Sequence, residues 1–161
     1  MATLTSFEVA QRIITCTLAG IDQYTDELTI SRSGVVPGEI AWDNCQCGQL
    51  VISENRRYPS RAFPLEEIDH SAECGEPWIV VDFTLSLTRC VPCGDDTAEP
   101  PDIALLEAAA EQLMKDKGDV RRAVMCCLTA LYDATHPADM IDAFELRAQE
   151  TVGPQGCCAG S

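Results

Sequence analysis

Two long segments of the chain alternate apolar with polar residues, the period-2 pattern of a β-strand with one buried face. In residues 78–89 every second position is apolar: Ile79, Val81, Phe83, Leu85 and Leu87. A matching strand is predicted over residues 49–58, paired antiparallel with the first. The connection at about residues 59–77 is long for a compact domain, and such loops are usually functional or ordered by a partner.

A helix is predicted to begin after Thr5, because Thr5-Ser6-Phe7-Glu8 fits a capping box. Its apolar residues recur at helical spacing and form one stripe, made of Phe7, Ala10, Ile14, Leu18 and Ile21. Gly20 and Asp22 mark its expected end.

A second helix is predicted from Pro100-Pro101-Asp102 to Gly118, since proline is tolerated in a first turn and an acid complements the helix dipole there. Asp119 either caps a third helix or continues the second, and helical sequence gives way before Pro137.

Two further strands and a loop are expected. Residues 27–31 form a candidate short strand, followed by a loop at Ser33-Gly34 and Pro37-Gly38. Residues 143–152 alternate apolar with polar positions and predict another strand, after which Gly153-Pro154 turns the chain. The order indicates an α+β fold, a mainly antiparallel sheet with helices packed on one face.

Length and charge narrow the class of protein. The 161 residues suit a single domain spanning 1–161. A formal charge of −15 argues against gripping the phosphate backbone of nucleic acid. No stretch approaches the roughly 20 apolar residues of a membrane span, and the N-terminus has no signal-peptide pattern. We therefore expect synthesis in the cytoplasm and no membrane association.

Ten cysteines are many for a cytoplasmic protein. Antiparallel pairing of the two long strands would make Cys47 and Cys90 neighbours, and hence candidates for a disulfide, which needs Cα atoms within about 7 Å. Two alternatives stay open. Cys90-Val91-Pro92-Cys93 has the spacing of thiol oxidoreductases, and Cys45 with Cys47, Cys90 and Cys93 could hold zinc.

Evidence for catalysis in the sequence is thin. His70 lies in an acidic loop and His136 precedes a proline, so both fit exposed polar residues better than a catalytic base. No nucleophile elbow, phosphate-binding loop, dinucleotide fingerprint or zinc-protease motif occurs. We expect a protein that is not an enzyme, with no catalytic residues, cofactor or metal.

Basic and aromatic residues gather near the end of the first long strand. Interface anchors favour these residue types, and on an acidic protein they would meet an acidic face of another copy. We interpret the group as a candidate inter-subunit interface, made of Arg56, Arg57, Tyr58, Arg61 and Phe63.

Framework residues across nearly the whole chain resemble a known family, the head-to-tail connector (neck) proteins of tailed phages that infect actinobacteria, most closely the tail terminator type. The resemblance rests on Ala41-Trp42-Asp43, Cys47-Gly48-Gln49-Leu50, Arg57-Tyr58-Pro59, Phe63-Pro64, Cys74-Gly75, Pro77, Arg89-Cys90, Pro100-Pro101, Gly153-Pro154 and Gly156-Cys157.

That resemblance implies a virion structural protein with a tail-terminator-like fold. It would form a homo-oligomeric ring, a hexamer by analogy, that caps the tail tube at the head-tail junction. Implied partners are further copies of itself, the tail tube protein, and a stopper or adaptor protein of the neck. DNA would pass through the lumen without specific binding. The implied location is the virion, reached from the host cytoplasm during assembly.

Overall fold

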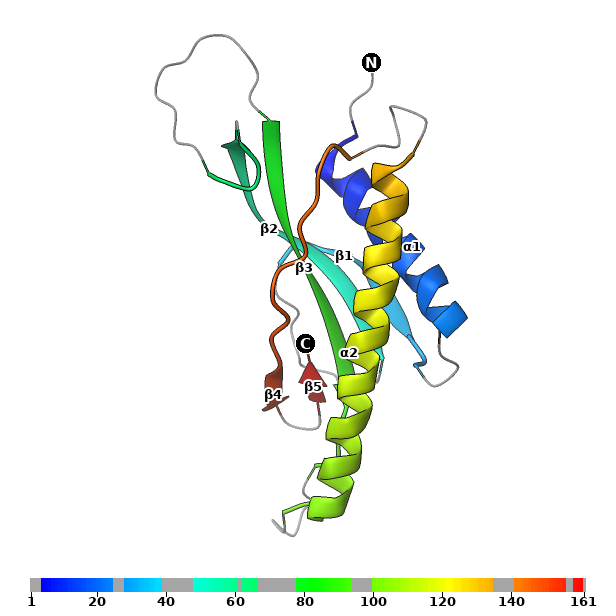
Figure 1. Cartoon of the computed structure of the whole chain (residues 1–161). Coiled ribbons are helices and arrows are strands. Elements are labelled where there is room, and N and C mark those ends of the chain that lie inside the picture. The colour runs from blue at the N-terminus through cyan, green and yellow to red at the C-terminus, as the bar shows by residue number, and fades with distance from the viewer. Residues whose placement is uncertain are drawn as a thin grey trace.

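The computed structural model describes residues 4–24, 28–38, 48–60, 62–66, 78–93, 100–134, 141–155 and 158–160. Within these ranges the chain forms two helices and five strands (Figure 1). In chain order they are α1 (Ser6–Tyr24), β1 (Arg32–Val36), β2 (Gln49–Ser60), β3 (Trp78–Cys90), α2 (Ile103–Tyr132), β4 (Val152–Gln155) and β5 (Cys158–Gly160).

The sheet has the strand order β1-β2-β3-β5-β4. Its centre is the predicted antiparallel pair, in which Leu50 faces Leu87 and Ile52 faces Leu85. The register shifts between Glu54 and Arg56, so a β-bulge at this point bends the pair. The prediction that residues 49–58 and 78–89 form an antiparallel pair is confirmed.

The α+β class is confirmed, but the sheet is mixed rather than mainly antiparallel. In its three-stranded core, β1 runs parallel to β2 while β2 and β3 are antiparallel. The parallel pair was missed because the sequence carries no local signal of strand direction. Two short antiparallel strands, β5 and β4, extend the sheet beyond the end of β3.

The first helix begins as predicted. The Thr5 hydroxyl accepts a hydrogen bond from the Glu8 amide at 3.2 Å, while the Thr5 amide donates to the Glu8 carboxylate at 2.7 Å. These reciprocal bonds are a capping box. The helix continues to Tyr24, past the expected end at Gly20 and Asp22.

The second helix is continuous for 30 residues, about 45 Å. The Asp102 carboxylate caps its start by accepting from the Ala104 amide at 2.9 Å. Gly118 and Asp119 lie inside the helix, so Asp119 continues it rather than starting a third one.

Both helices pack on one face of the sheet (Figure 1), and the core lies between the two helices and the sheet. Gly20 lets the helices approach, because a Cβ atom there would lie 3.0 Å from the Cβ of Ala123. The buried core comprises Ala10, Ile13, Ile14 and Ile21 of α1, Leu50, Ile52 and Leu87 of the sheet, Val120, Ala123, Val124 and Leu128 of α2, and Leu28.

The first short strand lies later than predicted, at Arg32–Val36 instead of residues 27–31. Ser33-Gly34, expected to form a loop, is part of this strand. Pairing with β2 decides the outcome, since Arg32 faces Gln49 and Val36 faces Ser53. Gly48 has φ +77° and its carbonyl accepts from the Ser31 amide at 2.7 Å, which joins the two strands at their start.

The predicted strand over residues 143–152 is wrong, because 143–151 form no strand ladder. Phe144 and Leu146 do point inward and pack against the core, so the alternation reflects burial without strand pairing. In Figure 1 this segment runs beside α2 and β3. Gly153-Pro154 lies inside β4 instead of forming a turn, and Pro154 is tolerated because β4 is an edge strand.

Candidate interaction surfaces

The predicted interface group centres on Arg56, which the structure places on β2. Its guanidinium donates to the Glu66 carboxylate at 2.7 Å and to the Asp82 carboxylate at 3.3 Å. It also lies 4.5 Å from the ring centroid of Tyr58, a cation–π distance. Tyr58 itself is buried, and its hydroxyl donates to the Pro64 carbonyl at 3.2 Å. Arg56 therefore already has acidic and aromatic partners within the chain.

Arg57 projects from the helix-facing side of the same strand. It forms an ion pair with Glu54 at 3.0 Å and donates to the Ser6 hydroxyl at the start of α1. Its hydrogen bond lowers the pKa of Glu54, with a second contribution from Ser6, and Glu54 raises the pKa of Arg57. Desolvation lowers the pKa of Arg56, but Glu66 and Asp82 outweigh it and raise that pKa.

Phe63 and Leu65 lie in the turn after β2, and both are exposed. Arg61, the remaining member of the group, lies outside the described residues. The structure thus brings Arg56 and Tyr58 together and leaves Arg57 on the other face of the sheet. The role of this group between subunits stays a prediction.

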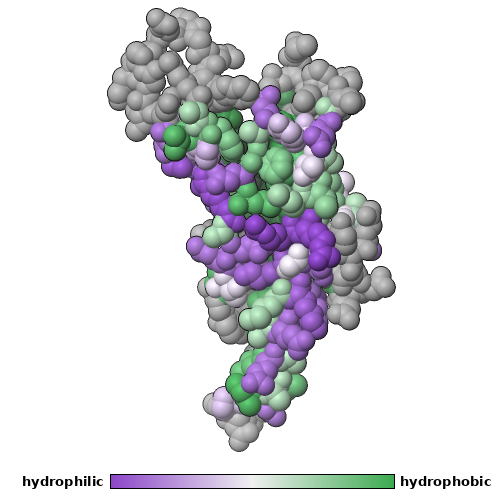
Figure 2. Space-filling model, viewed as in Figure 1, coloured by the Kyte–Doolittle hydropathy of each residue, from purple (hydrophilic) through white to green (hydrophobic). Residues whose placement is uncertain are grey.

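A second surface, absent from the sequence-based predictions, is the start of α2. Every buried residue of this helix lies at or after Leu113. Ile103 is 68% exposed and Leu105 is 57% exposed. In Figures 1 and 2 this end of the helix projects below the sheet and carries apolar surface. We call residues 103–110 the projecting segment.

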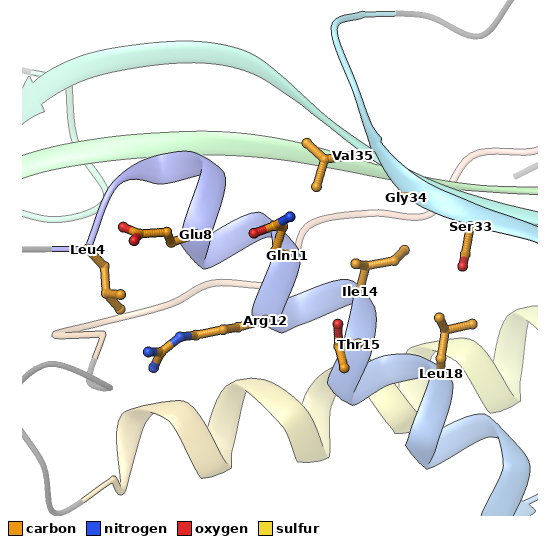
Figure 3. Close-up of a pocket in the computed structure, with 10 residues that line it drawn as sticks. All are labelled: Leu4, Glu8, Gln11, Arg12, Ile14, Thr15, Leu18, Ser33, Gly34 and Val35. Carbon is orange, nitrogen blue, oxygen red and sulfur yellow. The ribbon is translucent and has the colours of Figure 1, made fainter.

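A groove of about 590 Å³ runs between α1 and β1 (Figure 3). Its apolar lining comes from Leu4, Ile14, Leu18 and Val35. Charged groups in the lining are limited to Glu8 and Arg12, one of each sign. We call it the α1/β1 groove. The sequence predicted the inner stripe of α1 but gave no sign that part of it borders an open groove.

The cysteine predictions fall partly outside the described residues. Cys90 and Cys93 are both disulfide-bonded, whereas Cys45 and Cys47 lie outside the described ranges. The Cys47–Cys90 pairing therefore stays a prediction. Within the described ranges, no three side chains of the types that bind metals lie together.

A disulfide between Cys16 and Cys127 joins the two helices, with Cα atoms 5.7 Å apart. This disulfide is absent from the sequence-based predictions. A usable signal was present: Cys16 follows Ile13 by three residues and Cys127 follows Val124 by three, so both cysteines border apolar stripes that face the partner helix.

A buried ion pair joins α2 to the sheet. Arg89 Nε of β3 lies 2.5 Å from Asp116 Oδ2 of α2, and the Asp116 side chain is 1% exposed. Gln112 donates to the second carboxylate oxygen at 2.9 Å. Asp116 thus lies three residues after Leu113, where the buried part of α2 begins.

No protein-family model, curated protein or solved structure matches this chain. The geometry described above carries the functional argument. Among the helices in the described part of the chain, none combines the length and apolar character that crossing a membrane requires.

Proposed function

We propose that the chain is a non-enzymatic virion protein that forms an oligomeric ring at the phage head-tail junction. The ring would act as a tail terminator, capping the tail tube and docking it to the neck. Its copies contact one another, the tail tube protein and a stopper or adaptor protein. The family resemblance of the framework residues gives this proposal its biological context.

One observation carries the proposal: α2 extends well past the core and exposes large apolar side chains at its start. Ile103 and Leu105 are each more than half exposed. An isolated short helix gains little stability in water, and exposed apolar surface of this kind is typical of a protein interface. A partner that covers the projecting segment would explain both its length and its composition.

The charge of the chain supports the same proposal. At −15 per copy, a ring would surround its lumen with negative potential, so a DNA duplex would pass without binding. The same charge makes copies repel one another, which screening by salt weakens. Assembly should therefore strengthen as the salt concentration rises.

The alternative is a thiol-disulfide or zinc-binding protein that uses Cys45, Cys47, Cys90 and Cys93. Cys90 and Cys93 are disulfide-bonded, and sulfur atoms in disulfides do not act as thiolate ligands of zinc. This observation weighs against the zinc site, whereas a disulfide at a CxxC pair also fits the oxidised form of a thiol-disulfide protein. Metal analysis of the purified chain tests the alternative directly, since a zinc protein would hold about one equivalent of zinc.

The proposal is tested by sedimentation analysis and electron microscopy of the purified chain at several concentrations. We expect closed rings whose population grows from about 0.05 M to about 0.5 M salt. Added tail tube protein should collect at one face of the ring. A chain that stays monomeric across this range, alone and with the tube protein, would refute the proposal.

A further inference from the structure

The projecting segment is an apolar surface, and the α1/β1 groove, on a different part of the molecule, has a mixed lining in which four of ten residues are apolar. From this geometry we infer that neighbouring copies associate head to tail, with the projecting segment of one copy seated in the α1/β1 groove of the next. The inference rests on the proposed ring and names the contact that would build it.

The projecting segment has the composition of an anchor. Seven of its eight residues are Ile, Leu or Ala, and Glu107 is its only charged residue. The Asp102 cap satisfies an amide of its first turn, and the segment extends the packed part of α2 without a new nucleation step. Its side chains are held by a rigid helix, so little conformational entropy is lost on docking.

The α1/β1 groove offers a complementary surface. Its volume of about 590 Å³ falls in the range of sites that enclose several apolar groups. Ile14, Leu18 and Val35 supply apolar contacts on both sides of the groove.

Charge favours a second copy of the chain as the occupant. Two copies of charge −15 repel one another over most of their surfaces. The α1/β1 groove is close to neutral, with Glu8 and Arg12 in its lining, and the projecting segment carries one charge. These are surfaces at which two acidic copies can meet with little repulsion.

The positions of the two surfaces determine the kind of assembly. The projecting segment lies at the lower end of α2 in Figure 1, whereas the groove lies along the flank of the molecule formed by α1 and β1 (Figures 1 and 3). A contact between different surfaces is heterologous, and repetition of such a contact closes into a ring when the rotation between copies permits. An isologous contact through the segment alone would give a dimer.

Two substitutions test the two surfaces of this contact independently. Leu105→Glu places a charge on the projecting segment, and Thr15→Trp fills the groove from an exposed position of α1. Matched controls are Ala130→Glu on the packed part of α2 and Ala19→Trp on α1 outside the groove lining, both at exposed positions. Circular dichroism checks that each variant is folded.

We expect each test variant to raise the concentration of half-assembly by roughly tenfold or more. The two controls should assemble as the unmodified chain does. A mixture of Leu105→Glu with Thr15→Trp has one intact groove and one intact segment, so it should form a one-to-one dimer that does not grow into a ring.

Rings that persist unchanged in either folded test variant would overturn this inference and leave the proposed function standing. A mixture that stays monomeric, or a Thr15→Trp variant that dimerises by itself, would also overturn it, the latter by indicating an isologous contact or another partner surface. An unmodified chain that never assembles would refute the ring itself.

Discussion

The two parts of α2 share one continuous helix but have opposite surroundings. Residues 113–132 supply its buried side chains, bind α1 through a disulfide and hold the sheet through Asp116. Residues 103–112 contribute no buried side chain, although six of these ten residues are leucine or alanine, against five of the twenty in 113–132. Hydrophobic composition alone therefore does not locate the core, because the apolar residues of one helix divide between the fold and a surface proposed for a partner.

The largest expected loss of stability comes from removing the disulfide between α2 and α1. Replacing both Cys16 and Cys127 by alanine removes a cross-link that spans 111 residues. A loop of this length corresponds to about 5 kcal/mol in the free energy of unfolding. Denaturant unfolding under oxidising conditions measures the change.

Cys126→Ala is the matched control, because the exposed Cys126 lies beside Cys127 but outside this disulfide. Its unfolding free energy should change by less than about 0.5 kcal/mol. Equal stability of the double alanine variant and the unmodified chain would contradict a structural role for the Cys16–Cys127 link.

The second largest expected loss of stability comes from breaking the buried ion pair between Arg89 and Asp116. Arg89→Met leaves the Asp116 carboxylate buried without its cationic partner, which should cost about 3 kcal/mol of unfolding free energy. Adding Asp116→Leu to this variant should restore most of the loss, since two apolar groups then replace the pair. Thermal or chemical unfolding measures the stability of both variants. A double variant that is no more stable than Arg89→Met would contradict this account.

A matched pair of leucine substitutions compares the two parts directly. Leu113 is 8% exposed and Leu105 is 57% exposed. Leu113→Ala should reduce the unfolding free energy by about 2.5 kcal/mol through lost burial and a cavity. Leu105→Ala should change it by less than about 0.5 kcal/mol when measured at a concentration too low for assembly. Similar losses at both positions would show that the projecting segment is packed within its own chain.

The smallest expected effect is electrostatic and lies where the two parts of α2 meet. Glu111 pairs with Lys115 at 2.9 Å, and this hydrogen bond lowers the pKa of Glu111 below its ordinary value of 4.5. The pair therefore contributes stability above pH 4.5, and the contribution is lost as pH falls through the lowered pKa. Carboxyl titration by NMR should show this shift, and Lys115→Met should move the pKa back; an unchanged midpoint would contradict the pairing.

Local signals in the sequence were sufficient for the elements whose structure depends on neighbouring residues. The capping box of Thr5 and Glu8 predicted the start of α1, and alternation predicted β2, β3 and their pairing. The same reasoning failed where tertiary pairing overrides local preference. Ser33-Gly34 resembles a loop but pairs with β2, and Gly118-Asp119 resembles a helix boundary but lies within α2.

The candidate surfaces could be predicted only in part. The composition of residues 56–63 suggested an interface, but not that Arg56 and Arg57 would bind acids of their own chain. The α1/β1 groove depends on the position of β1, which alternation did not reveal. The projecting segment depends on which residues of α2 contact α1 and the sheet, a tertiary property that the helical pattern of the sequence does not reveal.

The Cys16–Cys127 link has a consequence for the integrity of the polypeptide. It encloses β1, β2, β3 and most of α2 in one covalent loop. A protease that cuts anywhere between the two cysteines opens this loop without releasing a fragment. The nicked protein would keep its full mass on a non-reducing gel and separate into two pieces only after reduction, so a single cut in this loop would leave the two parts of the chain joined.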